Sequence, residues 1–346
     1  MNIKEVFFPS ADGTLKIYGD LSLPLPVPEH SSEPLLPAIV VINGSGPIDR
    51  NGNAPQMKLN FNTANRFAEH MVQERRVGRK IAVLSYDKRG VGKSKKMGDK
   101  NLFYRTGMMD IVLDAVEAVR YLSHHPRIDK SKIVLMGHSE GAIILPLVCK
   151  EVQAAGLPDI FGCIFYSGFG ETIKNALEFQ RKNILAAVQT EVGLKGFILR
   201  KVVNEERLAK QFQDIMDKVH AEGDPDFIST QCGLVKQPAK WWREHIAYDA
   251  EAALKAYVTC HCLAITGQKD LQVHHEPCSP ENLKTLAPLA KSIESHRPVN
   301  LTHCLRSIEG QASILNLRKD YAKMGKLPLD EELLSITDDW CDRKLF

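Results

Sequence analysis

The sequence predicts an α/β fold, in which a mostly parallel sheet is flanked by helices and interrupted by an inserted helical cap. Short, fully apolar runs alternate with longer amphipathic stretches along most of the chain. Such runs are typical of strands buried on both faces, as in parallel sheets covered by helices. The alternation stops between residues 170 and 245, where the sequence is long, polar and helical. Because this insertion is too long for a plain loop, we expect a core of residues 1–169 and 246–346 and a helical cap of residues 170–245.

The first element is expected to be an antiparallel hairpin. The apolar runs EVFFPS and LKIYGDLSLP flank the segment ADGT, whose Asp12-Gly13 pair is a strong short-range hairpin signal. A proline-rich connector, LPLPVPEHSSEPLLP, follows at residues 23–37. We expect the parallel part of the sheet to begin after this connector.

The parallel sheet is predicted from apolar runs that alternate with helical stretches. The runs are AIVVING, KIAVLSYD, KIVLMG, DIFGCIFYSG, YVTCHCLAITG and PVNLTH. Helix-like stretches between them include residues 62–74 and 108–125. In the second stretch, apolar residues recur at helical spacing and predict one buried face. They are Ile111, Ala115, Ala118, Val119 and Leu122. No strand signal is visible in the predicted cap.

The composition excludes several classes of protein. Hydrophobic residues make up 44% and charged residues 25% of the 346 residues, which is typical of globular proteins and not of disordered chains, collagen or coiled coils. The 45 basic and 42 acidic residues nearly balance, so we expect no nucleic-acid and no membrane partner. No apolar run approaches the ~20 residues of a membrane-spanning helix. The amino terminus lacks a secretory signal pattern, and we expect a cytoplasmic protein.

The chain contains eight cysteines, and we expect free thiols because cytosolic proteins rarely form disulfides. Cys260 and Cys262 flank His261 in the segment CHC, which could suggest soft metal ligands. However, no second ligand pair occurs at zinc-finger spacing, and the segment lies in an apolar run. We therefore expect buried thiols and neither a metal ion nor a cofactor.

The pentapeptide GHSEG, Gly137 to Gly141, is the main functional signal. The pattern G-x-S-x-G alone should occur by chance in about one chain in ten of this length. Its setting strengthens it, because the apolar run KIVLM precedes it and the helical stretch GAIILPLVCK follows it. This order is that of a nucleophile elbow, in which a serine occupies a strained strand-to-helix turn. We predict that Ser139 is a nucleophile, between glycines that let strand and helix approach closely.

A serine nucleophile needs a base that accepts its proton and a third group that orients the base. In this architecture the carboxylate follows a later strand and the histidine follows the last strand. Asp270 follows YVTCHCLAITG, and His303 ends PVNLTH. We predict that Asp270 is the acid and His303 the base, at carboxyl ends of strands, where ligand crevices of open α/β sheets form.

Other residues compete for these two roles. His296 would precede the last strand, at the wrong end of the sheet, and His274 and His275 lie close behind Asp270. Asp270 could also be a capping or surface carboxylate, with Glu276 as the acid. These alternatives remain open from the residues alone.

Acyl transfer also requires N–H donors aimed at the oxyanion. The glycine-rich segment INGSGPIDRNG follows the run AIVV, and we predict that the backbone N–H groups of Ser45 and Glu140 form the oxyanion hole. A phosphate-binding loop is the alternative, but the segment lacks the G-K-[ST] ending of a P-loop and the full G-x-G-x-x-G pattern. The segment YDKRGVGKS lacks the first P-loop glycine, and we interpret it as a structural turn.

Together, NGSGPIDR, YDKRGVGKS, GHSEG, TGQKDLQV and LTHCL resemble the α/β-hydrolase superfamily over nearly the whole chain. The pair GSGPIDRNG and GHSEGA looks like the bacterial carboxylesterase and serine-aminopeptidase-like branch, in which a helical cap precedes the acid-bearing strand. The resemblance implies an α/β-hydrolase fold with Ser139 as nucleophile, Asp270 as acid and His303 as base. It also implies oxyanion donors at Ser45 and Glu140.

One departure from the resembled pattern is visible. Many relatives carry His-Gly where this chain has Asn43-Gly44. Since the oxyanion donor is a backbone N–H, we expect the exchange to change local hydrogen bonds and to leave the hole intact. In related sequences, Asp49 and Arg50 look like a support for the oxyanion loop.

These observations imply a cofactor-free serine hydrolase that cleaves a small acyl ester through an acyl-enzyme intermediate, with the cap setting substrate size. A peptidase or amidase remains an alternative, in which Glu178, Glu205 or Glu206 of the cap would bind a free amine. An acyltransferase also remains open. A non-catalytic binding module is disfavoured, because it would not need the full candidate triad. Trp241 and Trp242 either line the pocket or pack where the cap rejoins the core.

Overall fold

The computed structural model describes residues 1–25, 34–75, 79–220, 225–230, 235–310 and 312–346. Within them, the strands form one large sheet and one separate two-stranded sheet. The large sheet contains β1 (Asn2–Pro9), β2 (Lys16–Leu23), β3 (Leu36–Ile42), β4 (Ala82–Tyr86), β5 (Ile128–His138), β6 (Gly162–Tyr166), β9 (His261–Ile265) and β10 (Ser292–His296). The small sheet pairs β7 (Phe227–Thr230) with β8 (Val235–Pro238).

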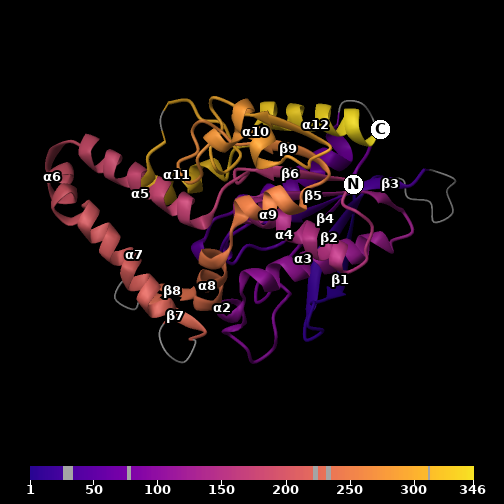
Figure 1. Cartoon of the computed structure of the whole chain (residues 1–346), viewed down its shortest axis with the longest axis horizontal. Coiled ribbons are helices and arrows are strands. Elements are labelled where there is room, and N and C mark those ends of the chain that lie inside the picture. The colour runs from indigo at the N-terminus through magenta and orange to yellow at the C-terminus, as the bar shows by residue number, and fades with distance from the viewer. Residues whose placement is uncertain (26–33, 76–78, 221–224, 231–234, 311) are drawn as a thin grey trace.

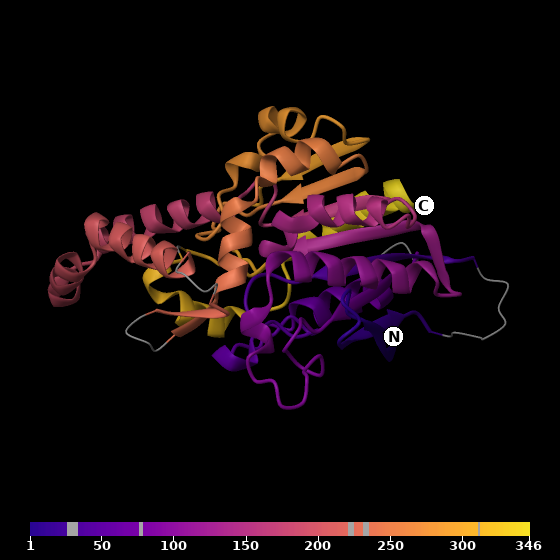
Figure 2. The same ribbon diagram turned by 60° about the horizontal axis from the view of Figure 1, so that its bottom comes forward.

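Helices lie between most of the strands (Figures 1 and 2). They are α1 (Thr63–Glu69), α2 (Leu102–Arg105), α3 (Met108–Ser123), α4 (Glu140–Ala154), α5 (Ile173–Thr190), α6 (Gly193–Val202), α7 (Glu205–Val219), α8 (Ala239–Ala247), α9 (Ala250–Tyr257), α10 (Pro280–Leu286), α11 (Leu317–Met324) and α12 (Glu331–Leu345). Shorter helical turns are η1 (Pro55–Met57), η2 (His70–Glu74), η3 (Glu276–Cys278) and η4 (Ile314–Asn316). Among the described residues, none of these helices has the length and hydropathy that a membrane crossing requires.

The large sheet is mostly parallel, as the sequence predicted. Its strand order is β1-β2-β4-β3-β5-β6-β9-β10. The predicted hairpin is confirmed, because β1 and β2 are antiparallel and Phe8 pairs with Ile17 across them. The pairing of β2 with β4 is also antiparallel, and every later pair of neighbours in this order is parallel. Residues 26–33 of the expected connector lie outside the described residues.

Helices cover both faces of the sheet, because its central strands are apolar on both sides. In β3, Val40 and Ile42 pack into one core with residues of α3, α4 and α9. Ile39 and Val41 of the same strand pack into a second core with residues of α1 and α12. Successive side chains of a strand point to opposite faces, so the continuous run AIVVI feeds both cores. These two layers fix the sheet that carries the functional site.

The segment of residues 170–245, predicted to be a helical cap, adds no strand to the large sheet. Its helices α5, α6 and α7 extend away from the sheet in both views, and α8 leads back to it (Figures 1 and 2). The expectation of no strands here was wrong, since β7 and β8 form a short hairpin. Ile228 of β7 is buried in a small core with Val219 and Trp242, so tertiary packing stabilises a pair too short to give a sequence signal. Residues 221–224 and 231–234 lie outside the described residues.

The last strand also differs from the prediction. It is SIESH at residues 292–296, parallel to β9, and not the apolar run PVNLTH. Each residue of β10 is half-buried because the strand lies at the edge of the sheet, so it lacks the apolar run that marks a central strand. His296 therefore ends the last strand, whereas we expected it to precede that strand.

Replacement of Trp340 should reveal how far the second core depends on α12. The Trp340 side chain is fully buried, and a Cβ at Gly162 of β6 would lie only 2.7 Å from its ring. Trp340→Ala is expected to reduce the free energy of unfolding by about 3–5 kcal/mol, because it leaves a cavity over the sheet. Urea titration monitored by circular dichroism measures this loss. Leu289→Ala, at a half-exposed leucine, is the control, and an equal loss in both variants would contradict the packing account.

Candidate active site

Ser139 lies in the sharp turn between β5 and α4. Its backbone has φ 56° and ψ −121°, which is a strained conformation for a residue with a side chain. A Cβ at Gly137 would lie 2.4 Å from the carbonyl oxygen of Gly141, and one at Gly141 would lie 2.0 Å from that of Ile42. Both positions therefore require glycine, and the turn has the geometry that the pattern G-x-S-x-G predicted.

The structure brings Ser139, His303 and Asp270 into one hydrogen-bonded chain. His303 Nε2 lies 3.1 Å from Ser139 Oγ, and His303 Nδ1 lies 2.8 Å from Asp270 Oδ2. The carboxylate can only accept, so Nδ1 carries the proton and Nε2 is free to accept a proton from the hydroxyl. This arrangement can activate a serine hydroxyl as a nucleophile.

Asp270 is held as a buried carboxylate in the loop after β9. Its Oδ1 accepts hydrogen bonds from the N–H groups of Gln272 at 2.8 Å and Val273 at 2.9 Å. Burial favours the protonated form, but the charge and hydrogen bond of His303 and the two backbone N–H groups outweigh it and lower the pKa of Asp270. The carboxylate therefore stays charged and orients the imidazole.

His303 lies in a loop, seven residues beyond the end of β10. We had predicted it directly at the end of a strand, so this part of the prediction was wrong. Part of the support of His303 comes from His138, the residue before Ser139. His138 Nε2 donates to the carbonyl oxygen of His303 at 2.8 Å, and the two rings lie 5.1 Å apart. Burial and the neighbouring His303 lower the pKa of His138 to about 3, so this ring stays neutral.

Arg306 provides the second support for the His303 loop. Its guanidinium is fully buried and donates to the carbonyl oxygens of Cys304 and Phe61, each at 2.6 Å. It also donates to Thr63 Oγ1 at 2.8 Å. These bonds connect the loop that carries His303 to the start of α1.

The two residues predicted to supply the oxyanion donors adjoin the turn at Ser139. A Cβ at Gly44 would lie 3.1 Å from Ser139 Cβ, so the loop after β3 passes directly beside the nucleophile. The peptide group between Gly44 and Ser45 carries the N–H of Ser45. Glu140 is the first residue of α4, and its N–H has no preceding helical turn to bond. The role of these two N–H groups as oxyanion donors stays a prediction.

Glu140 contributes a buried side chain that our sequence reasoning missed, because only its N–H was considered. Its carboxylate accepts from Lys88 Nζ at 2.8 Å, from His245 Nε2 at 3.0 Å and from Trp241 Nε1. Burial would raise the pKa of Glu140, but Lys88 and His245 lower it to about 2. The sequence shows Glu140 and Lys88 as charged residues, but nothing in it indicates that their side chains are buried together.

The other candidates for acid or base lie apart from the triad. His275 and Arg297 lie 3.7 and 3.3 Å from Glu276, and His274 packs against Phe179. His296 lies at the end of β10. Among the interactions of the described residues, none joins these groups to Ser139 or His303.

Asp49 and Arg50 belong to the loop that follows β3, and both form contacts that hold this loop. Asn43 Nδ2 donates to the carbonyl oxygen of Asp49 at 3.2 Å, so the asparagine that replaces the expected histidine links the two ends of the loop. Arg50 is buried and forms ion pairs with Asp87 at 2.9 Å and Asp20 at 2.8 Å. These contacts fix the loop against the sheet.

A group of three thiols is the candidate metal site among the described residues. Cys163 Sγ lies 3.6 Å from the Sγ atoms of both Cys149 and Cys260. Cys262, which we had considered with Cys260, instead lies against the carbonyl oxygen of Cys260. Hydrogen bonds with Cys149 and Cys260, together with burial, raise the pKa of the Cys163 thiol, whereas the hydrogen bonds with Cys149 and Cys163 lower the pKa of Cys260.

A cavity of about 360 Å³ adjoins the predicted oxyanion residues. It is lined by Ser45, Gly46, Pro47, Met57, Lys88, Phe103, Thr106, Ile111, Glu140, Lys236, Gln237, Pro238, Trp241 and Trp242. Its walls thus come from the loop after β3, from α3 and from α8 with the residues before it. Both tryptophans line the cavity, while Trp242 also belongs to the small core with Val219.

Glu171 is a second buried carboxyl group near the triad, which the sequence did not identify. Its two oxygens accept from the N–H groups of Thr172 at 2.9 Å and His274 at 3.4 Å. Burial raises the pKa of Glu171 to about 7, and the charge of Asp270 adds to the increase. Between the ordinary pKa of a glutamate and about 7, the Glu171 carboxyl group therefore holds a proton in the folded protein and loses it in the unfolded chain.

The stability contributed by protonated Glu171 should be lost as the pH rises through about 7. Glu171→Gln removes this titration, so the variant should gain roughly 1–3 kcal/mol in unfolding free energy relative to the wild type between pH 5 and pH 8. Urea titrations at several pH values measure the difference. Glu206→Gln, at an exposed position, is the control, and a difference for Glu171→Gln that does not change with pH would contradict this prediction.

Part of the chain is similar to a known protein family. A family model described as serine aminopeptidase, S33, matches residues 62–224. No curated protein matches the chain significantly.

Similar solved structures include an esterase of Pyrococcus furiosus, with 13% identity over 100% of this chain and 91% of that chain and a TM-score of 0.53. The α/β-hydrolase GrgF from Penicillium sp. sh18 has 15% identity over 93% and 98% of the two chains and a TM-score of 0.51. An acylaminoacyl peptidase of Pyrococcus horikoshii has 12% identity over 99% of this chain and 41% of that chain, with a TM-score of 0.52. At these identities the likeness shows the fold. That fold is the α/β-hydrolase fold, and the family match over residues 62–224 supports an enzyme of the serine hydrolase type.

Proposed function

We propose that the protein cleaves a small carboxylic ester through an acyl-enzyme intermediate. The observation that carries this proposal is the hydrogen-bonded chain from Ser139 Oγ through His303 to Asp270, at 3.1 and 2.8 Å. The strained turn at Ser139 supports it, because a structural serine would not need a positive φ between two obligatory glycines. The esterase fold of the Pyrococcus furiosus neighbour agrees with it.

In the proposed mechanism, Ser139 Oγ attacks the ester carbonyl carbon while its proton moves to His303 Nε2. Asp270 stabilises the resulting imidazolium through the Nδ1–H bond. The backbone N–H groups of Ser45 and Glu140 bind the oxyanion. The tetrahedral intermediate collapses as His303 gives the proton to the departing alkoxide, which leaves as an alcohol. Water, deprotonated by His303, then attacks the acyl-enzyme and releases the carboxylic acid.

The cavity beside Ser45 and Glu140 is the proposed site for part of the substrate. Its volume of about 360 Å³ suits a small to medium acyl or alcohol group. Apolar side chains such as Phe103, Ile111 and Trp242 line it, so it favours an uncharged organic group. Because α8 and β8 form one wall, we propose that the segment of residues 170–245 acts as a cap that sets substrate size.

Peptidase or amidase activity is the second candidate, favoured by the description of the matching family model. It would need an anionic group for a free amine. Glu178 and Glu205 both pair with Arg181, at 2.7 and 2.8 Å, so their charge is already compensated. Aminoacyl p-nitroanilides assayed beside p-nitrophenyl esters separate the two activities. Acyl transfer to another acceptor would use the same intermediate and appears as faster turnover when an alcohol is added.

Removal of the nucleophile is the first test of the proposed function. Ser139→Ala should reduce turnover of p-nitrophenyl acetate to the level of the buffer, because no acyl-enzyme can form. Asp270→Asn should lower kcat by about 10⁴-fold, because the amide stabilises the wrong imidazole tautomer. Steady-state assays with Ser131→Ala as control measure both effects. Turnover that persists in Ser139→Ala would refute the proposed function.

Enlargement of the cavity should change acyl-chain preference. Trp242 is nearly buried and lines the cavity, so Trp242→Ala opens space in its wall. In a series of p-nitrophenyl esters from acetate to dodecanoate, the variant should have its maximal kcat/KM at a longer chain than the wild type. Phe7→Ala, at a half-exposed residue of β1, should leave the optimum unchanged. An unchanged optimum in Trp242→Ala would exclude this cavity as the acyl site.

A further inference from the structure

Lys88 has an ammonium group buried next to the oxyanion loop. Its Nζ donates to the carbonyl oxygen of Gly44 at 2.6 Å and to Glu140 Oε2 at 2.8 Å. The side chains of Lys88 and Glu140 are 5% and 1% exposed. A buried ion pair adds little net stability, because desolvation of both charges offsets their attraction. The contact with Gly44 therefore needs an explanation beyond stability.

The carbonyl of Gly44 and the N–H of Ser45 belong to one planar, trans peptide group. They point in opposite directions, so a bond that holds the oxygen also fixes the direction of the N–H. A cation at the oxygen further polarises the peptide and strengthens its N–H as a donor. Gly44 itself lies beside Ser139, as the 3.1 Å approach of its hypothetical Cβ to Ser139 Cβ indicates.

Glu140 connects this peptide to α8. Its Oε2 accepts from Lys88, while its other oxygen accepts from Trp241 and His245, both on α8. His245 is buried, so this end of the network is also shielded from water. Glu140 thereby holds the ammonium group of Lys88, which in turn orients the Ser45 N–H, one of the two predicted oxyanion donors. The backbone N–H of Glu140 itself is the second predicted donor.

We propose that Lys88 and Glu140 are positioning residues that align and polarise the two oxyanion donors, with α8 holding Glu140 in place. This inference rests on the proposed function, since it assigns the support of the same oxyanion hole. The inference also gives the segment of residues 170–245 a second role. Its helix α8 would hold the two oxyanion donors in position and would also form a wall of the cavity.

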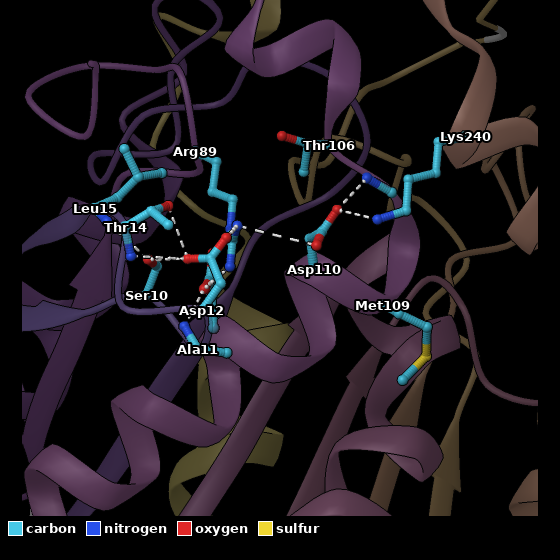
Figure 3. Close-up of polar contacts among 12 residues, drawn as sticks. Ser10, Ala11, Asp12, Thr14, Leu15, Arg89, Thr106, Met109, Asp110 and Lys240 are labelled. Atoms are coloured by element: carbon cyan, nitrogen blue, oxygen red, sulfur yellow. Dashed lines mark hydrogen bonds and ion pairs between the residues drawn. The ribbon is translucent and has the colours of Figure 1, made fainter. Parts of the chain in front are cut away.

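A second buried ion pair in the same turn offers a matched control. Arg89, the next residue, pairs with Asp114 of α3 at 2.6 Å and with Asp12 of the β1–β2 turn at 2.8 Å. Figure 3 shows Arg89 between Asp12 and Asp110, with Lys240 on the far side of Asp110. Arg89 is as buried as Lys88, and its partners lie on α3 and in the β1–β2 turn, whereas Lys88 contacts Gly44 and Glu140.

The test compares two charge-removing double variants of the full chain, Lys88→Met/Glu140→Gln and Arg89→Met/Asp114→Asn. Each removes both members of a pair, so no unpaired buried charge remains. Two readouts depend on the oxyanion hole: kcat for p-nitrophenyl acetate, and the inhibition constant of a trifluoromethyl ketone, which forms a tetrahedral adduct. Active enzyme is counted by fluorophosphonate labelling of Ser139, and thermal unfolding reports stability.

For Lys88→Met/Glu140→Gln we expect kcat to fall by about ten- to hundredfold with KM within about threefold, because the donors act in the transition state. The inhibition constant should rise by a similar factor. The Arg89 pair should lose stability while keeping kcat per labelled site within about threefold. If the first double variant does not fold, Glu140→Gln alone should lower kcat by at least about fivefold, because the amide removes the charge that holds Lys88 and replaces one of the two acceptor oxygens by a donor.

An equal effect of both double variants on kcat, or a loss of stability alone for the Lys88 pair, would overturn the inference while leaving the esterase proposal intact. The same holds if Glu140→Gln keeps wild-type kcat. Absence of any fluorophosphonate labelling of wild-type Ser139 would instead overturn the proposed function and this inference with it.

Discussion

The turn at Ser139 is the constraint on which the rest of the structure depends. Three stretches of backbone converge there, because Gly137 and Gly141 leave no room for a Cβ against each other and against the end of β3. This convergence places the hydroxyl at the carboxyl end of a central strand and starts α4 directly behind it. The loops after β9 and β10 reach the same edge of the sheet, so the proposed base and acid meet the serine from strands far away in sequence.

A second theme is the burial of charge around this turn. The segment YDKRGVGKS, interpreted from sequence as a structural turn, buries three consecutive charged residues, Asp87, Lys88 and Arg89. Each points to a different partner: Asp87 to Arg50 of the loop after β3, Lys88 to Gly44 and Glu140, and Arg89 to α3. This turn therefore contacts the loop after β3, helix α4, helix α3 and the β1–β2 hairpin. Burial of these charges costs desolvation free energy.

The sequence predicted the fold well where strands are central and apolar. The hairpin, the parallel sheet and the helices at residues 62–74 and 108–125 were confirmed, because periodicity reports burial directly. The edge strand β10 and the short pair β7–β8 were missed, since half-buried or very short strands leave no apolar run. Likewise, Glu140 and Lys88 could be seen as charged residues, but only tertiary structure brings their side chains together. The assignment of the triad and of residues 170–245 as a cap remains a proposal.

Trapping of the acyl-enzyme tests the central claim most directly. The wild-type protein is mixed with excess p-nitrophenyl acetate, quenched in acid within one turnover, and digested for peptide mass mapping. The account predicts one acetyl group per chain, on the peptide that contains Ser139 and on no other, formed with a stoichiometric burst of p-nitrophenol. Turnover of the ester with no acyl group on Ser139, or with the group on another residue, would contradict the account.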